Sequence, residues 1–98
     1  MSCDWLITVR DGKVVKLSFD MFELQPSFGQ PCTKDYVEIL DGKDRSSASK
    51  GRLCGKEKPE DIQSSERYMR VIFRSDASAA YYKGFKATFR ETSRGTFI

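Results

Sequence analysis

Short segments in which apolar and polar residues alternate constrain the fold of this chain more than any other feature. Successive side chains of a β-strand point to opposite faces, so a period of two indicates a strand with one buried face. Asp11-Gly12 and Asp41-Gly42 are turn signals between such segments. No long helical pattern interrupts them, so we predict an all-β chain folded as an antiparallel sandwich or barrel. The alternating segments are residues 3–10, 13–20, 37–39, 68–74 and 84–90.

The spacing of the segments also predicts local structure. Residues 3–10 and 13–20 flank a two-residue loop, which predicts a hairpin between them. Residues 57–66 are charged and leave room for at most one helical turn. The periodicity stops after Arg90, so residues 1–90 are predicted to form the domain and residues 91–98 a tail or linker. The predicted core contains the aromatic residues Trp5, Phe19, Phe73, Phe85 and Phe89.

The composition excludes several classes of function. The chain has no histidine, so catalysis by Ser-His or Cys-His pairs and metal sites built on histidine lack their parts. It also has no phosphate-binding loop and no paired acid and base, so we do not expect an enzyme. The net charge of +3 is small and mixed with acids, which argues against a nucleic-acid partner. No apolar run is long enough for a membrane span.

The three cysteines leave the redox state open. In a small secreted domain, an odd number means that one partner is missing or that one thiol is free. In a cytosolic domain, three scattered cysteines would simply be reduced. Composition alone does not choose between these alternatives.

Several motifs, taken in their order along the chain, resemble the CUB domain family. The resemblance runs from Cys3 to about Phe89 and implies an extracellular β-sandwich of the jelly-roll type that serves as a binding module. CUB domains usually have four cysteines, and this chain resembles one that begins at the second. The first strands of the family pattern are then absent, which leaves free sheet edges and predicts an edge-paired or swapped homodimer. The motifs are Cys32-x-x-Asp35-Tyr36-Val37-Glu38-Ile39, Cys54-Gly55, Ser75-Asp76-x-Ser78 and Gly84-Phe85.

The resemblance implies a disulfide between Cys32 and Cys54, and it leaves Cys3 without its family partner. Cys3 is then a free thiol, with an intermolecular disulfide as the alternative.

The resemblance also implies a calcium site, because many CUB domains bind calcium near one end of the sandwich. The implied ligands are Gln25, Asp35 and Asp76, with Ser78 nearby. Calcium prefers six or more oxygen ligands with sufficient negative charge. Gln25 supplies an oxygen but not the charge of the family's glutamate, and Glu23 is the nearest substitute. The alternative is that Asp35 caps a turn and Asp76 binds loop amides.

In calcium-binding relatives, the ion orders loops that capture a lysine or arginine of a protein partner. The resemblance therefore implies a contact surface flanked by Tyr36, Glu38, Tyr81 and Tyr82. Large amphipathic tyrosines suit an interface, although packing of Tyr81 and Tyr82 onto the sandwich is an equal alternative.

We therefore expect a non-catalytic, extracellular protein–protein interaction module, dependent on calcium, from a multidomain secreted or cell-surface protein. One alternative is an exosite or regulatory domain of an extracellular protease. Another is a heparin- or glycan-binding module, which would use a basic stripe formed if the last two strands are neighbours. The stripe would consist of Arg70, Arg74, Lys86 and Arg90.

Overall fold

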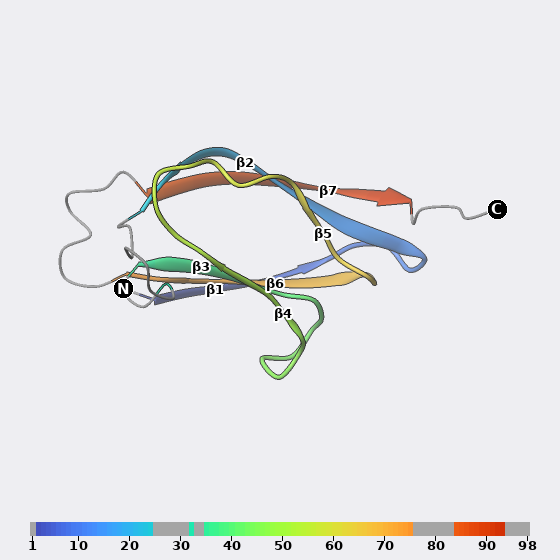
Figure 1. Ribbon diagram of the computed structural model, residues 1–98. Helices are drawn as coiled ribbons and strands as arrows, with labels where there is room; N and C mark the ends of the chain where they lie inside the picture. Colours follow the sequence, from blue (N-terminus) through green and yellow to red (C-terminus); the bar gives the residue numbers. More distant parts are fainter. Residues whose placement is uncertain (1, 25–31, 33–34, 76–83, 94–98) are drawn as a thin grey trace.

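The computed structural model describes residues 2–24, 32, 35–75 and 84–93 (Figure 1). Within these residues every regular element is a β-strand, and no helix occurs. The strands are β1 (Ser2–Thr8), β2 (Lys13–Glu23), β3 (Tyr36–Leu40), β4 (Ser49–Leu53), β5 (Ile62–Gln63), β6 (Tyr68–Arg74) and β7 (Gly84–Ser93).

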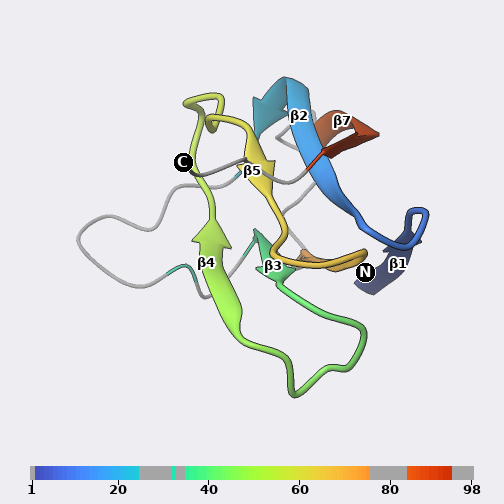
Figure 2. The same cartoon turned by 90° about the vertical axis from the view of Figure 1, so that its right-hand side faces the viewer.

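The strands form two antiparallel sheets that lie face to face (Figure 1). The four-stranded sheet has the order β1-β6-β3-β4, and the three-stranded sheet has the order β5-β2-β7. Figure 2 shows β4 on the opposite side of β3 from β1. The predicted all-β antiparallel sandwich is confirmed.

The predicted hairpin around Asp11-Gly12 is wrong. β1 pairs with β6, whereas β2 pairs with β5 and β7, so the two segments lie in different sheets. The turn itself is present: Gly12 has a φ of 83°, and the Lys13 amide donates a 3.0 Å hydrogen bond to the Arg10 carbonyl. The segments that form β1 and β2 each carry an apolar face. These two faces can cover each other only if the strands lie in different sheets, because paired neighbours in one sheet lie side by side.

The core lies between the inner faces of the two sheets. Val37, Ile39 and Met69 are fully buried in the four-stranded sheet and face Phe19 of the three-stranded sheet. The β2 register shifts between Phe19 and Met21, which brings Phe22 onto the same inner face as Phe19. The full buried cluster is Ile7, Val9, Val15, Leu17, Phe19, Phe22, Leu24, Val37, Ile39, Met69 and Val71.

Part of the predicted aromatic core is wrong. Phe19 is buried, and Phe73 and Phe85 are half-buried, but Trp5 is 45% exposed and Phe89 is 56% exposed. Both exposed side chains belong to edge strands, β1 and β7, where the neighbouring strand that would cover them is absent among the described residues. Alternation predicts the face on which a side chain lies, but not whether that face is covered.

Two segments contain strand that the alternation did not reveal. The segment 57–66 contains β5 instead of a helical turn, because Ile62 pairs with Leu17 and the buried Ser64 hydroxyl accepts a 2.8 Å hydrogen bond from the Val15 amide. β7 continues to Ser93, and Glu91 forms an ion pair with Arg10. Residues 91–93 are therefore part of the strand. The division into a domain and a tail stays a prediction, since residues 94–98 lie outside the described residues.

Candidate functional site

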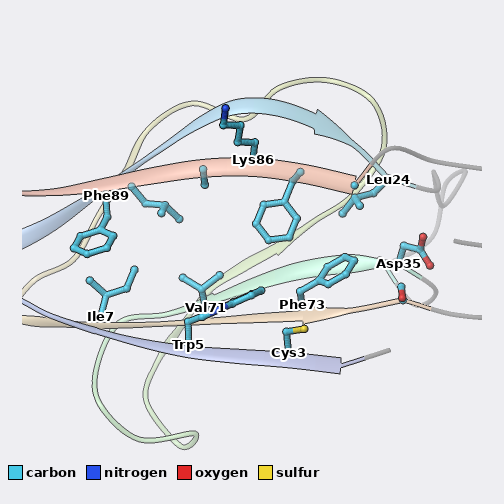
Figure 3. A pocket seen from close by; sticks show the side chains of 14 residues that line it. Cys3, Trp5, Ile7, Leu24, Asp35, Val71, Phe73, Lys86 and Phe89 are labelled. Carbon is cyan, nitrogen blue, oxygen red and sulfur yellow. The ribbon is translucent and has the colours of Figure 1, made fainter. Parts of the chain in front are cut away.

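A cavity of about 700 Å³ opens between the two sheets on the side where β1 and β7 are the edges (Figure 3). Its walls are mainly apolar, with Trp5, Ile7 and Phe73 from one sheet and Phe85 and Phe89 from the other. In the described part of the chain, β1 pairs only with β6 and β7 only with β2. Both outer edges therefore present backbone groups without a neighbouring strand, as the predicted edge pairing requires. The homodimer itself stays a prediction.

The cysteines separate into a disulfide and a thiol. Cys32 and Cys54 are joined, with their Cα atoms 5.9 Å apart, so the implied disulfide is confirmed. Cys3 is a half-buried free cysteine that lines the cavity.

Asp35 lies at one end of the same cavity, immediately before β3 (Figure 3). Its side chain is only 1% exposed, and a buried carboxylate requires compensation by hydrogen-bond donors or a cation. A buried oxygen ligand of this kind fits a calcium site. The other implied ligands, Gln25, Asp76 and Ser78, lie outside the described residues. Among the residues that are described, no three acidic or cysteine side chains form a metal-binding group.

Tyr36 and Glu38, two of the predicted binding residues, both contact Arg52. The Arg52 guanidinium carbon lies 4.2 Å from the centroid of the Tyr36 ring. Its Nε lies 3.5 Å from Glu38 Oε1, and its Nη1 donates a 3.1 Å hydrogen bond to the Cys32 carbonyl. The Ser49 hydroxyl donates a 2.9 Å hydrogen bond to the second Glu38 carboxylate oxygen. The role of Tyr36 and Glu38 in binding stays a prediction, and Tyr81 and Tyr82 lie outside the described residues.

The predicted basic stripe does not form. β6 and β7 belong to different sheets, so Arg70 and Arg74 do not share a face with Lys86 and Arg90. The alternation of β6 and β7 is similar, but alternation does not specify which strands become neighbours.

Arg70 instead takes part in a cluster around Asp4. Arg70 Nη1 lies 2.8 Å from one Asp4 carboxylate oxygen, and Arg45 lies 2.7 Å from the other. Burial by itself raises the pKa of Asp4, but the hydrogen bonds and charges of the two arginines outweigh it and lower the pKa overall. Arg70 Nε also donates a 2.9 Å hydrogen bond to the Lys43 carbonyl, which ties the loop after β3 to this face.

With this geometry established, comparison with known proteins decides the family. A profile of the CUB domain family matches residues 1–89. The chain belongs to the CUB domain family. Its fold is accordingly the jelly-roll β-sandwich of CUB domains, as the sequence motifs implied.

This CUB domain is similar to parts of much longer proteins. It is 40% identical over 92 residues to cubilin of Sus scrofa, covering 94% of this chain and 2% of cubilin. It is 40% identical over 89 residues to the inactive serine protease PAMR1 of Pongo abelii, covering 91% of this chain and 12% of that protein. The chain therefore spans a small fraction of these relatives.

Solved CUB structures are also similar. The human MASP-1/3 CUB1-EGF-CUB2 structure superposes with a TM-score of 0.80 at 29% identity, covering 96% of this chain and 36% of that one. The MASP-1 CUB2 domain bound to Ca²⁺ superposes with a TM-score of 0.78 at 29% identity, covering 92% of this chain and 77% of that one.

The sequence analysis did not predict the contacts of Arg52, nor the exposure of Trp5 and Phe89 on the edge strands. The segment around Arg52 reads Ser-Lys-Gly-Arg-Leu and has no clear alternation, so its face could not be assigned. One signal for the position of Arg52 was available: it lies two residues before Cys54 in the sequence, and a disulfide between Cys54 and Cys32 brings that segment beside Cys32. Within the described residues, no helix has the length and apolar character needed to cross a membrane.

Proposed function

We propose that this CUB domain is a non-catalytic module that binds another protein in the extracellular space, within a multidomain secreted or cell-surface protein. Membership of the CUB family supports an interaction module in general. The relatives include the inactive protease PAMR1, Tolloid-like protein 2 and an exoskeleton protein, each much longer than this chain.

We further propose that binding depends on calcium held near Asp35. The observation that carries this proposal is the nearly complete burial of the Asp35 carboxylate at the end of the sandwich, beside Tyr36. The similarity to a MASP-1 CUB2 domain crystallised with Ca²⁺ supports it. Gln25, Asp76 and Ser78 are the further ligands implied by the family pattern. The ion would order the adjoining loops, and the protein partner would then dock at this end of the sandwich.

Calorimetric titration of the EDTA-treated chain with calcium tests the site. We expect saturable heat for the native chain and its loss in Asp35→Asn, because calcium binds carboxylates more strongly than amides. Asp11→Asn is the matched control, since Asp11 lies in an exposed turn outside the proposed site. Calcium should also raise the melting temperature of the native chain and of the control, but not of Asp35→Asn. No heat from the native chain at millimolar calcium would rule out the calcium-dependent form of the proposal.

An accessory role beside a protease domain is the second candidate, favoured by the similarity to PAMR1, Tolloid-like protein 2 and MASP-1/3. A protease or protease-like domain encoded in the same gene would support it, and a gene without one would exclude it. The heparin-binding alternative loses its predicted stripe, since the two pairs of basic residues lie on different sheets.

A further inference from the structure

The outer face of the four-stranded sheet carries charged side chains beside two buried apolar residues, Leu40 and Ile72. Val37 and Ile39 are buried in the core, so Tyr36 and Glu38, which alternate with them along β3, lie on the outer face. Tyr36 is only 8% exposed there. In the antiparallel register, Tyr36 lies opposite Arg74 of β6, and Glu38 lies opposite Arg52 of β4. Opposite residues share a face, so two arginines flank Tyr36 on the outer surface.

The charges on this face are unevenly matched. The acidic residues of the strands are already occupied: Asp4 pairs with two arginines, and Glu38 contacts Arg52 and Ser49. Asp41 accepts hydrogen bonds from Ser65. The basic residues outnumber the acidic residues on the face and in the loop that borders it. The basic residues are Lys43, Arg45, Lys50, Arg52, Arg70 and Arg74, and the acidic residues are Asp4, Glu38, Asp41 and Asp44.

The Arg52 side chain is fixed by three contacts. Stacking on Tyr36, the hydrogen bond to the Cys32 carbonyl and the contact with Glu38 fix its guanidinium from three directions. These contacts use only some of its five N–H donors, and the side chain remains 42% exposed. A planar guanidinium fixed in this way loses little conformational entropy on binding and can form paired hydrogen bonds with a carboxylate.

We propose that Arg52 and Arg74 form the binding surface for a carboxylate-bearing segment of the protein partner, a proposal that rests on the interaction function above. Arg52 already occupies the ring face of Tyr36 and the carboxylate of Glu38. A lysine or arginine of a partner brought to the same two groups would meet the like charge of Arg52 a few ångströms away. At this face, the recognised residue is therefore acidic rather than basic.

The geometry favours a protein segment over a sulfated glycan. Arg45 and Arg70 are tied to Asp4, which leaves Arg52 and Arg74 on the strands on either side of β3 rather than in a long row. Two arginines on either side of β3 suit one or two carboxylates of an acidic peptide. An extended polyanion gains affinity from many cations in succession.

NMR titration with two short peptides tests the proposal. The probes are acetyl-Gly-Glu-Gly-Glu-Gly-amide and its counterpart with lysine in place of glutamate. We expect the glutamate peptide to shift the Arg52 Nε–H and Tyr36 amide resonances, and the lysine peptide to leave both unchanged. The glutamate response should persist in EDTA. It would therefore hold even if the calcium titration failed, and the two proposals can fail separately.

Variants of matched charge assign the effect to this face. The double variant Arg52→Gln/Arg74→Gln should weaken glutamate-peptide binding by about tenfold or more, because charge-assisted hydrogen bonds are lost. Lys86→Gln/Arg90→Gln removes the same charge from the other sheet and should change binding less than about twofold at physiological salt. Arg52→Lys should give an intermediate loss, because it keeps the charge without the planar fork. Circular dichroism confirms that each variant folds, and Arg74→Gln alone provides a milder change.

Three results would overturn the proposal. Equal losses in the two double variants would show a general charge effect. Binding of the lysine peptide at Tyr36 would show that this face recognises a basic residue of the partner instead of an acidic one. A heparin tetrasaccharide that shifts the same resonances at lower concentration than the glutamate peptide would assign this face to glycans.

Discussion

Removal of the Cys32–Cys54 disulfide offers the most direct test of what stabilises this sandwich. The two cysteines are separated by 22 positions in sequence. For a loop of this length, restriction of the unfolded chain contributes about 3.4 kcal/mol to the free energy of unfolding. Domains of this size have total stabilities of about 5–15 kcal/mol, so the loss is a large fraction. The double variant Cys32→Ala/Cys54→Ala should therefore melt roughly 15 °C below the native chain.

Other contacts should keep the folded state of this variant close to the native one. The Leu24 amide donates a 2.8 Å hydrogen bond to the Gly55 carbonyl, and Arg52 donates a hydrogen bond to the Cys32 carbonyl. Both interactions are independent of the sulfur atoms, so the loss should arise mainly in the unfolded state. The near-ultraviolet circular dichroism of the folded variant should therefore resemble that of the native chain.

Equilibrium urea unfolding of the oxidised native chain and of the double variant measures the difference. Cys3→Ala is the matched control, because it removes the cysteine that forms no disulfide. We expect this control to lose much less stability than the double variant. A loss below about 1 kcal/mol in the double variant would refute the loop-entropy argument. An equally large loss in Cys3→Ala would show that the effect comes from changing a cysteine rather than from opening the loop.

Three further predictions concern acid stability, the core and the free edge. The two arginines lower the pKa of Asp4 in the folded state, so its contribution to the free energy of unfolding is present at neutral pH and is lost as pH falls from the ordinary aspartate value of 3.8 through the folded pKa. The urea midpoint of Asp4→Asn should therefore fall less than that of the native chain between pH 6 and pH 2.5, and an unchanged pH profile would contradict this. Ile39→Ala should lower the free energy of unfolding by about 2–5 kcal/mol, because Ile39 is fully buried. Its control, Thr88→Ala on the exposed face of β7, should change this free energy by no more than about 0.5 kcal/mol. If the homodimer forms through β1, analytical sedimentation should detect a dimer of the native chain, and Leu6→Lys should reduce the dimer fraction by placing a charge on that edge. A native chain that is monomeric at all concentrations would exclude pairing through β1. So would an equal effect of the control Thr88→Lys, on the basic face of β7.

The strands themselves could be predicted from the sequence to a large extent. The alternation around Val37 and Ile39 placed these residues in the core, and both are fully buried. The partners of the strands could not be predicted. The Asp11-Gly12 turn suggested a hairpin, yet the chain crosses from one sheet to the other there. Alternation is a local property, whereas strand pairing depends on which distant segments bury each other's faces.

The candidate site shows the same division. The cysteine and aspartate motifs led to the disulfide, which is confirmed, and to Asp35, whose burial the sequence could not supply. Arg52 could not be placed, because its contact with Glu38 requires the register between β3 and β4, which shifts along the pair. The exposure of Trp5 also could not be predicted from the sequence, because it depends on the absence of a neighbouring strand among the described residues.

The sequence by itself therefore determined the class of secondary structure, the disulfide partners implied by the family pattern, and the family itself. These properties depend on the residue period and on the order of motifs along the chain. Only the tertiary structure decided which strands are neighbours, that the basic residues of β6 and β7 lie on different sheets, and that Arg52 stacks on Tyr36. Such contacts join residues far apart in the chain, and they form only when two sheets are brought together to bury a common core.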